Sequence, residues 1–593
     1  MEKTIIIELA KKYIENEKES GFCGEVEELL SKTDDAGAFK ELEDRFYRNL
    51  EFGTGGLRGI TGGGYNRMNT LVVKNATQGL ANYLIKTFPK KAAAGKLSAV
   101  IAYDSRHYSA EFAEAAALVF TGNGIKTWLF SGMRPTPELS FAIRHLGCDT
   151  GIVVTASHNP PNYNGYKAYW NDGSQIIPPH DTGIIDEVNA VAAGDGKNIK
   201  DITREEAAGR GLLEIIDREI DEPYHAMVKS RLFRLQLIKE KAGGVKIVYT
   251  PLHGTGAMHV EKVLGDLGLK VITVPEQREG DGDFPTVSFP NPEEAAALEM
   301  AIELGKKEKA DIVMATDPDA DRFGIAVSEK GCFILLTGNQ TGVLLVDYIF
   351  LSLKEQGKLP ANAAMINTIV TTGMQRRVAQ FYGAECYDCL TGFKWIADLM
   401  RRWEKGLASG DPAARTFVFG AEESYGYLVE TEARDKDGIS AAALTAEMTL
   451  YWRSKGKSLL DRLNELYEIC GYWQELGISK YFQGSQGQEI MKSIMDKYRS
   501  HPPASLGNIP IIKIRDIEKG TGDLPPSDVL QFFLEDGTVV SVRPSGTEPK
   551  IKFYASCCAE VQGGKEGGGL EKAKAEAASK LDVIEKDIRQ IIG

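Results

Sequence analysis

The chain has 593 residues and a mass of 64.9 kDa, with 43% hydrophobic and 26% charged residues. This composition is typical of a globular protein and excludes a disordered or fibrous one. Its length predicts several domains, because single hydrophobic cores stop growing at ~250–300 residues. The 70 basic and 83 acidic residues give a net charge of −13, which disfavours non-specific binding to nucleic acids or anionic membranes. We therefore expect small-molecule ligands, with any anion held by a local positive pocket.

Nothing in the chain has the pattern of a targeting or membrane segment. The N-terminus has three consecutive isoleucines before charge returns, which is too short for a signal-peptide core. The most apolar later stretch, GVLLVDYIFLSL, is interrupted by Asp347, whereas a membrane span needs about 20 apolar residues. The pair Cys386-x-x-Cys389 lacks a second pair at zinc spacing. We expect a cytoplasmic protein with reduced thiols and no membrane segment.

The pattern of elements changes along the chain. Residues 1–52 carry apolar side chains at helical intervals and predict a helical lead-in. The Gly-rich residues 52–64 are interpreted as a flexible loop that presents Arg58 to an anion. From Leu97 onward, short apolar runs alternate with stretches of helical period, which predicts α/β units with parallel sheets. The expected strands are 98–103, 150–156, 245–250, 310–316 and 415–420, the expected helices are 110–120 and 295–307, and the last helix is expected over 570–593.

The first chemistry-bearing loop contains Ser157. It follows the strand-like residues 151–154, and Asn159-Pro160-Pro161 forces a loop there. Open α/β sheets bind ligands beyond the carboxyl ends of their strands, so Ser157 lies where a nucleophile is expected. A polar β-turn is the alternative, and the Gly-x-Ser-x-Gly elbow of α/β-hydrolases is absent.

The second loop carries Asp317, Asp319 and Asp321 between two strand-like runs. Three carboxylates at alternate positions of a tight loop can converge on a hard divalent cation. An EF-hand does not fit, because Arg322 stands where that loop needs glycine. A phosphatase of the haloacid dehalogenase type also uses Asp-x-Asp after a strand, but a Thr or Val usually follows where this chain has Asp321. An exposed acidic turn is the remaining alternative.

The third and fourth loops offer polar groups for a sugar and for an anion. Glu422 and Ser424 can accept from and donate to vicinal hydroxyls, although a helix N-terminus also favours Glu and Ser. In the fourth loop an arginine can grip a phosphate while hydroxyls and backbone amides complete a nest. A Walker A motif is absent, and an ordinary Pro/Gly turn is the alternative. The fourth loop consists of Arg543, Ser545, Gly546 and Thr547 with their neighbours.

Three further turns are interpreted as scaffold. They are Asp104-Ser105-Arg106, Arg134-Pro135-Thr136-Pro137 and the turn at His253.

A nucleophile, a cation cage, a sugar-binding loop and a phosphate cradle follow one another along the chain, and the economical arrangement is four domains around one cleft. In this order, and with Gly-Thr-Gly-Gly-Leu-Arg-Gly at 53–59, the loops resemble the α-D-phosphohexomutase superfamily, in its phosphoglucomutase branch. The resemblance covers nearly the whole chain from about residue 40. It implies an α/β fold of three similar mixed α/β sandwich units followed by a smaller α+β domain. The expected domains are 1–218, 219–335, 336–475 and 476–593.

The resemblance also implies a role for each matching residue. Ser157 would be the phosphoserine and a ligand of Mg²⁺, together with the three aspartates. Arg58, His158 and Lys167 match residues near the transferring phosphate that are candidates for proton transfer, and Arg322 adds positive charge there. Residues that match substrate contacts are Thr391, Lys394, Glu422, Ser424, Lys436, Arg543, Ser545, Gly546 and Thr547.

The implied activity is interconversion of glucose 1-phosphate and glucose 6-phosphate through glucose 1,6-bisphosphate. A phosphopentomutase, a phosphomannomutase or a glucose 1,6-bisphosphate synthase on the same scaffold is the enzymatic alternative. Gly-Ala-Glu-Glu-Ser departs from the commoner Gly-Glu-Glu-Ser form, which leaves the choice of sugar open. A non-catalytic sugar-phosphate sensor would be expected to have lost Ser157 or an aspartate, and all of them are present.

Overall fold

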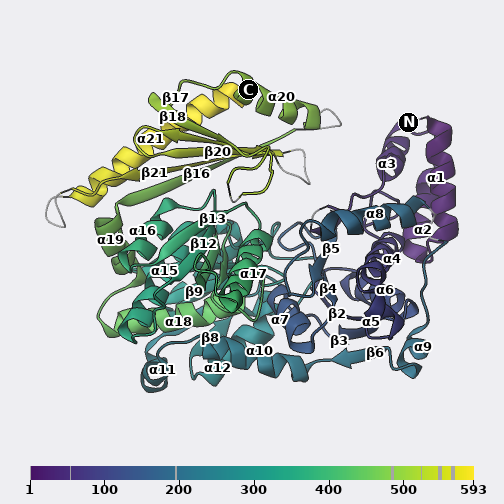
Figure 1. Cartoon of the computed structure of the whole chain (residues 1–593), viewed down its shortest axis with the longest axis horizontal. Coiled ribbons are helices and arrows are strands. Elements are labelled where there is room, and N and C mark those ends of the chain that lie inside the picture. The colour runs from purple at the N-terminus through teal and green to yellow at the C-terminus, as the bar shows by residue number, and fades with distance from the viewer. Residues whose placement is uncertain are drawn as a thin grey trace. The chain divides into compact units, whose positions relative to one another are not determined.

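The computed structural model describes residues 2–53, 55–193, 197–482, 487–522, 524–544, 550–562 and 568–592. The chain forms two compact units. Unit 1 comprises Met1–Leu335 and Gly426–Glu447, and unit 2 comprises Leu336–Tyr425 and Met448–Gly593. Each unit contains two sheets with their helices (Figure 1). Within the described ranges, no helix has the length and apolar character needed to cross a membrane.

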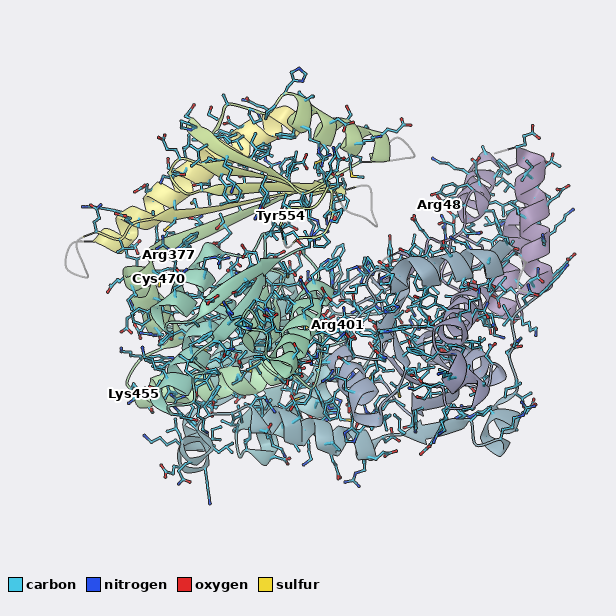
Figure 2. All side chains as sticks on the ribbon, in the orientation of Figure 1. Arg48, Arg377, Arg401, Lys455, Cys470 and Tyr554 are labelled. Atoms are coloured by element: carbon cyan, nitrogen blue, oxygen red, sulfur yellow. The ribbon has the colours of Figure 1, made fainter. Side chains whose placement is uncertain are left out.

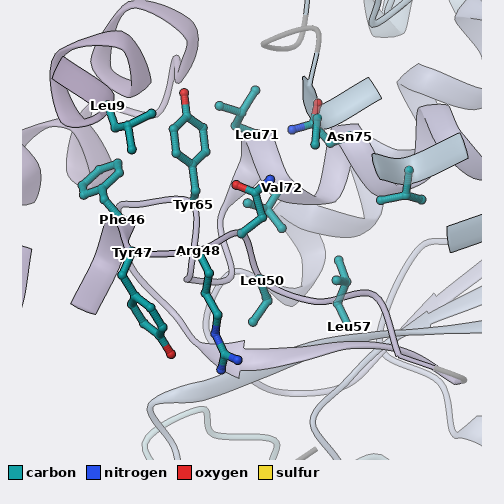
Figure 3. Close-up of a pocket in the computed structure, with 13 residues that line it drawn as sticks. Leu9, Phe46, Tyr47, Arg48, Leu50, Leu57, Tyr65, Leu71, Val72 and Asn75 are labelled. Atoms are coloured by element: carbon teal, nitrogen blue, oxygen red, sulfur yellow. The ribbon is translucent and has the colours of Figure 1, made fainter. Parts of the chain in front are cut away.

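The predicted helical lead-in is confirmed. It consists of α1 (Lys3–Asn16), α2 (Ser20–Ser31) and α3 (Ala36–Phe46). The apolar spacing in α1 places Ile6, Ala10 and Tyr13 on one buried face, where they pack with Val26 and Leu42 of the next two helices. A mostly apolar cavity of about 320 Å³ remains where the lead-in meets the first sheet domain (Figure 3). It contains none of the residues that carry the predicted chemistry.

The first sheet has the strands β1 (Gly56–Ile60), β2 (Ser98–Tyr103), β3 (Lys126–Phe130), β4 (Thr150–Val154), β5 (Tyr163–Trp170) and β6 (Leu213–Ile216). Their order is β1-β5-β4-β2-β3-β6. The strands β4, β2, β3 and β6 are parallel, whereas β5 is antiparallel to both β4 and β1. Because β2 and β4 are parallel neighbours, the loops that follow them lie at the same sheet edge.

The interpretation of residues 52–64 as a flexible loop was wrong in part, since Arg58 lies on strand β1. Arg58 pairs with Gly165, and Gly56 pairs with Lys167. A side chain at Gly56 would lie 1.8 Å from the Tyr166 carbonyl oxygen, and its φ is +127°. Close strand pairing therefore requires glycine at position 56. From the sequence, the glycines of this segment were interpreted as a sign of flexibility instead.

Helices cover both faces of the first sheet, which is why its central strands are apolar throughout. In β2, Ala99 and Ile101 belong to the core that also contains residues of α4 and α6. The helices of this domain are α4 (Thr70–Thr87), α5 (Pro89–Ala93), α6 (Ser109–Gly122), α7 (Thr136–Leu146), α8 (His180–Ala193) and α9 (Arg204–Gly209).

The second sheet has the strands β7 (Lys246–Thr250), β8 (Lys270–Thr273), β9 (Ile312–Thr316), β10 (Phe323–Glu329) and β11 (Cys332–Leu335), in the order β11-β10-β9-β7-β8. The strands β9, β7 and β8 are parallel, and β10 returns antiparallel to β9. The short turn between β9 and β10 therefore projects from the carboxyl end of β9. The helices are α10 (Arg218–Ser230), α11 (Leu235–Lys241), η1 (Ala242–Gly244), α12 (Gly256–Asp266), α13 (Pro275–Arg278), η2 (Ala295–Leu298) and α14 (Glu299–Glu308).

In unit 2, β12 (Ala363–Thr368) pairs in parallel with both β13 (Glu385–Cys389) and β14 (Thr416–Glu422). The helices of this region are α15 (Gly338–Glu355), α16 (Gly373–Phe381), α17 (Phe393–Ser409) and α19 (Leu459–Cys470). Strand β15 (Gly426–Leu428) belongs to unit 1, and α18 (Gly438–Ser454) runs from unit 1 into unit 2.

The fourth sheet has β16 (Tyr472–Tyr481), β17 (Ser505–Leu506), β18 (Ile509–Asp516), β19 (Leu530–Leu534), β20 (Val539–Pro544) and β21 (Lys550–Ala559), in the order β16-β21-β20-β19-β18-β17. All its pairs are antiparallel. The helices α20 (Gly487–Ser500) and α21 (Gly569–Ile592) belong to this domain, and α21 buries Ala573, Ala577, Leu581 and Ile584 in the same core as the strands. Strand β16 runs across the domain boundary that the sequence placed between residues 475 and 476.

Candidate active site

The Ser157 loop leaves β4 at the predicted place. Ser157 is 3% exposed and has a φ of +53°, a left-handed conformation that costs a non-glycine residue about 1–2 kcal/mol. Its backbone N–H donates to the Thr155 hydroxyl over 2.8 Å. Its own hydroxyl donates to Asp317 Oδ2 over 2.8 Å and lies 3.2 Å from His158 Nδ1. The loop therefore holds the Ser157 hydroxyl against the acidic loop of the second sheet.

Arg106 supports the same loop through its guanidinium group. The sequence interpretation placed Arg106 in the scaffold but did not identify the loop that it supports. Its guanidinium donates to the backbone carbonyl oxygens of Ser157 and Asn159. It also donates to those of Pro160, over 2.7 Å, and Tyr163, over 3.0 Å. One buried side chain thus satisfies four backbone acceptors of the loop.

Asp104 completes this support. Its carboxylate accepts from the Thr155 and Ser109 hydroxyls over 2.6 and 2.8 Å, and lies 3.3 Å from Arg106 Nε. Asp104 and Arg106 follow β2, the parallel neighbour of β4. The spacing Asp-x-Arg after a strand was the available signal, but the sequence does not show which strands are neighbours.

The three aspartates converge in the turn between β9 and β10, as predicted. Asp317 and Asp319 are completely buried, Asp321 is 2% exposed, and one carboxylate oxygen from each lies within 4.8 Å of the others. The Oδ1 atoms of Asp319 and Asp321 are buried without a hydrogen-bond partner in the described part of the chain. Buried carboxylate oxygens are costly unless they are paired or bind a metal. The residues therefore fit a hard divalent cation such as Mg²⁺.

Two lysines lie against this acidic group. Lys167 Nζ is 2.6 Å from Asp319 Oδ2 and 2.9 Å from Asp321 Oδ2. Lys436 Nζ is 3.2 Å from Asp321 Oδ2 and 3.0 Å from Asp435 Oδ1. Lys436, expected as a substrate contact, is thus placed beside the acidic loop. Arg58 lies on the strand next to Lys167 and projects from the same face of the sheet.

The pKa values follow from burial and from these neighbours. Burial, together with Asp319 and Asp321, raises the pKa of Asp317 well above its usual range. Burial by itself would raise the pKa of Asp321. The nearby cations, Lys167 first among them, have the larger opposite effect, so the pKa of Asp321 lies below its usual range. Burial opposes the charge of Lys167, but the two carboxylates that it contacts raise its pKa. Lys167 therefore stays protonated at neutral pH.

His158 and the surrounding arginines have distinct roles. Burial, followed by Arg322 and Arg58, lowers the pKa of His158 well below its ordinary value, so its imidazole is neutral and can accept a proton. Arg58 Nη1 lies 3.5 Å from Asn159 Oδ1. The Arg322 guanidinium is paired with Glu293, while its backbone N–H donates to Asp317 Oδ1 over 3.0 Å. All of these residues belong to unit 1.

Two more of the turns interpreted as scaffold support the acidic loop directly. Thr136 Oγ1 donates to Asp319 Oδ2 over 2.6 Å, and its backbone N–H donates to the Asp319 carbonyl oxygen. A Cβ on Gly254, next to His253, would lie 2.3 Å from Pro318 Cα. Gly254 therefore permits the close approach of two backbones that positions the acidic loop.

The predicted sugar-contact residues of unit 2 lie at the carboxyl ends of its parallel strands. Glu422 ends β14, and its Oε1 accepts from the Gly392 backbone N–H over 2.8 Å. This contact brings Glu422 next to Thr391, whose Oγ1 is buried without a hydrogen-bond partner in the ranges that the structure describes. Ser424 is partly exposed in the turn after β14. The Lys394 ammonium lies over the Trp395 ring, 5.5 Å from its centre.

Arg543 lies near the end of β20 and is partly exposed. The three other residues of the predicted phosphate loop, Ser545, Gly546 and Thr547, lie outside the described residues.

Comparison with protein-family models gives four matches in succession along the chain. Alpha/beta/alpha domains I, II and III of phosphoglucomutase/phosphomannomutase match residues 49–194, 222–331 and 337–470, and the C-terminal domain matches 507–565. The chain belongs to the phosphoglucomutase/phosphomannomutase family. The four-domain α/β fold and the resemblance to the α-D-phosphohexomutase superfamily are thereby confirmed, and the protein is an isomerase of this family.

Curated relatives of this phosphoglucomutase/phosphomannomutase family member have different substrates in their names. A probable phosphoribomutase of Schizosaccharomyces pombe is 34% identical over 93% of both chains. A phosphopentomutase of Homo sapiens is 34% identical over 92% of this chain and 91% of its own. A phosphoglucomutase of Staphylococcus epidermidis is 33% identical over 87% of this chain and 92% of its own. These likenesses show the family to which the chain belongs, but they do not identify its sugar substrate.

A solved structure shares the fold of this family member. The crystal structure of pp63/parafusin, a phosphoglucomutase from Paramecium in its open form, matches with a TM-score of 0.65 and 17% identity over 91% of this chain and 96% of its own.

Proposed function

We propose that this protein interconverts glucose 1-phosphate and glucose 6-phosphate through a phosphoserine at Ser157 and a glucose 1,6-bisphosphate intermediate. The observation that carries the proposal is the Ser157 hydroxyl, 2.8 Å from Asp317 within a buried group of three carboxylates. A serine beside a buried acidic group suits a phosphoryl carrier whose charge is balanced by a divalent cation.

Asp317, Asp319 and Asp321, with a phosphoserine oxygen, would hold Mg²⁺, which would neutralise the charge on the transferring group when bound. The residues of the chain supply the rest of the positive charge. A phosphoserine carries about −1.5 to −2, so Lys167, Arg58 and Arg322 are assigned to the phosphoryl oxygens. In-line positioning and charge stabilisation are the main needs of phosphoryl transfer.

In the first step, the 6-hydroxyl of glucose 1-phosphate attacks the phosphorus of phosphoserine 157, and the bond from phosphorus to the serine oxygen breaks. The hydroxyl proton must leave at the same time, and the neutral His158 imidazole is the candidate to accept it, while the protonated Lys167 ammonium is the candidate to supply the proton that the leaving Ser157 oxygen takes up. The bisphosphate then turns end for end, and Ser157 takes the phosphoryl group from the other end. The product is glucose 6-phosphate, and the enzyme is phosphorylated again.

The substrate contacts are assigned from the family likeness. Glu422 and Ser424, with Thr391, Lys394 and Lys436, would bind the sugar, since carboxylate, hydroxyl and ammonium groups complement vicinal hydroxyls. The fourth loop would hold the phosphate that is not reacting, with the Arg543 guanidinium as the bidentate donor. Its further members are Ser545, Gly546 and Thr547.

A phosphopentomutase is the second candidate function. It is favoured by the curated relatives named phosphopentomutase and phosphoribomutase, which are each 34% identical to this chain, against 33% for the Staphylococcus epidermidis phosphoglucomutase. The same four loops could serve either sugar, because the transferring group and the second phosphate are common to both. A phosphomannomutase or a glucose 1,6-bisphosphate synthase would use the same carrier serine.

The test is a kinetic panel with the 1-phosphates of glucose, ribose, mannose and glucosamine, with wild type and Ser157→Ala side by side. We expect the highest kcat/KM with glucose 1-phosphate and no turnover of any substrate by the variant. A higher kcat/KM with ribose 1-phosphate would replace the first proposal by the second.

A further inference from the structure

A polar cavity of about 240 Å³ lies within unit 2, apart from the residues assigned to the reaction. Its wall is formed by the carboxyl end of β12, the first turn of α16 and strands β18 to β21 of the fourth sheet. Neither Glu422, Ser424, Thr391 nor Arg543 lines it. The cavity therefore offers a set of groups that the proposed reaction does not use.

The charges on its wall are unbalanced. Arg376, Arg377 and Arg515 line the cavity with one carboxylate, that of Asp388. Three positive groups against one negative group leave an excess of two positive charges, in a chain whose net charge is −13. Glu475 lies behind the wall, where it accepts from the Ser556 hydroxyl over 3.3 Å. Positive charge gathered in a concave site of an acidic protein favours an anionic ligand.

The three guanidinium groups differ in how far their donors are used. Arg376 donates to Asp388 Oδ1 over 2.6 Å and to a backbone carbonyl. Among the residues that the structure describes, Arg515 donates only to the neutral amide oxygen of Gln531. Arg377 makes no hydrogen bond or ion pair with any residue of the described ranges and is labelled in Figure 2. Arg377 and Arg515 therefore keep donors for a ligand.

A second observation points to the rest of the ligand. Asn367, which also lines the cavity, is 2% exposed, and its Oδ1 has no hydrogen-bond partner among the residues that the structure describes. A buried acceptor left unpaired is destabilising, and a ligand hydroxyl would satisfy it. The hydroxyls of Thr371 and Ser541 are further polar groups on the wall.

We propose that this cavity binds a small polyol that carries two phosphates, with one phosphate on Arg515, the other on Arg377, and a hydroxyl donating to Asn367 Oδ1. Guanidinium groups bind phosphate oxygens through paired, charge-assisted hydrogen bonds. The ligand would lie against Thr368 and Thr371, whose hydroxyls lie 3.1 and 3.4 Å from Glu423 Oε2. Glu423 precedes Ser424, so the cavity adjoins the loop assigned to sugar binding.

The test is site-resolved protection of arginines in the full-length protein. Phenylglyoxal modifies accessible guanidinium groups, and peptide mass spectrometry gives a rate for each arginine. With fructose 1,6-bisphosphate at about four times its Kd, about four fifths of the sites are filled, and Arg377 and Arg515 should react about fivefold more slowly. Arg218, whose side chain is 87% exposed, is the reference and should be unaffected. Sorbitol, and KCl at matched ionic strength, should give no protection.

Paired variants complete the test. Calorimetric titration of Arg377→Gln/Arg515→Gln with fructose 1,6-bisphosphate should lose one binding event that Arg218→Gln retains, and Arg377→Lys should restore part of it. Equal protection of Arg218, protection by KCl, or unchanged binding by the double variant would each overturn the proposal. Ser157→Ala should keep the protection of Arg377, so a failure of the proposed mutase activity is distinguishable from a failure of this site.

Discussion

The reactive loops of unit 1 are more uniformly buried than the predicted substrate-contact residues of unit 2, which include the 5% exposed Glu422 together with partly exposed side chains. Ser157 and Asp319 are almost fully buried, and each is tied by several side-chain hydrogen bonds. Ser424, Lys394 and Arg543 are partly exposed. Stabilisation of a charged transition state needs fixed groups shielded from water, whereas groups that bind and release a substrate must remain accessible. The difference predicts that variants in unit 1 lower kcat, whereas variants in unit 2 mainly raise KM.

We expect Ser157→Ala to have the largest effect of the variants that test this difference between the two units. Without a phosphoryl carrier the relay has no path, and we expect kcat to fall by at least about 10⁴-fold. Intact-mass analysis should show a phosphorylated fraction in wild type that maps to Ser157 and is absent from the variant. Ser500→Ala, at the exposed end of α20, is the matched control. Wild-type turnover by Ser157→Ala would show that Ser157 is not the phosphoryl carrier.

Asp319→Asn should have the next largest effect. It removes one charge from the buried acidic group while keeping the size of the side chain, so Mg²⁺ should bind at least about 100-fold more weakly, since loss of an outer-shell partner alone costs 10–100-fold. Turnover against Mg²⁺ concentration and titration with a chelator measure this change. Asp411→Asn, at an exposed position, is the control. If a chelator left the activity of both variants and wild type unchanged, a structural acidic turn would be the better interpretation.

Arg106→Lys tests whether the buried support of the Ser157 loop sets its reactivity. A lysine cannot reach four carbonyl oxygens, and each charge-assisted hydrogen bond contributes about 1.5–3 kcal/mol, so kcat should fall by about 10- to 150-fold. Because Arg106 acts through the loop, KM should change little, and the thermal midpoint is measured alongside. Arg218→Lys is the control. A rise in KM with normal kcat would contradict a positioning role.

Arg543→Ala should have the smallest effect on chemistry. The loss of one charge-assisted contact to the non-reacting phosphate should raise KM for glucose 1-phosphate by about 10- to 150-fold. The phosphoserine content of Ser157 should stay close to that of wild type, and kcat should fall only to the extent that remote binding energy is lost. Steady-state kinetics and mass spectrometry measure both quantities. Lost phosphorylation with normal KM would place Arg543 at the reacting end of the sugar.

The structure and the sequence agree best where chemistry depends on a single loop. The acidic turn between β9 and β10, and Ser157 after β4, follow from local patterns of strand, proline and carboxylate. Glu422 and Gly392 meet because β12 lies between the strands that precede their loops. The proximity of Glu422 and Gly392 depends on the strand order of the sheet, which the sequence of neither loop shows.

The flexible-loop interpretation of residues 52–64 was wrong in part, because glycine can permit either a flexible loop or a closely paired strand. The Gly-rich segment around Arg58 is partly a paired strand, because its glycines permit close contact with β5. Arg106 and Thr136 were interpreted as scaffold, and they do support the Ser157 loop and Asp319, but the sequence did not show which loops they hold. An arginine that binds a substrate and one that binds a buried loop have the same local sequence pattern.

By itself the sequence determined the alternation of strands and helices, the four chemistry-bearing loops and the family. These depend on residues within a few positions of one another, where side-chain period and backbone geometry act. Only the tertiary structure decided that Ser157 meets Asp317 and that Lys167 meets Asp319 at hydrogen-bond distances, and that Arg106 supports the Ser157 loop. Such contacts join residues 50 or more positions apart. They are set by strand order and by burial, which raises the cost of every unpaired polar group.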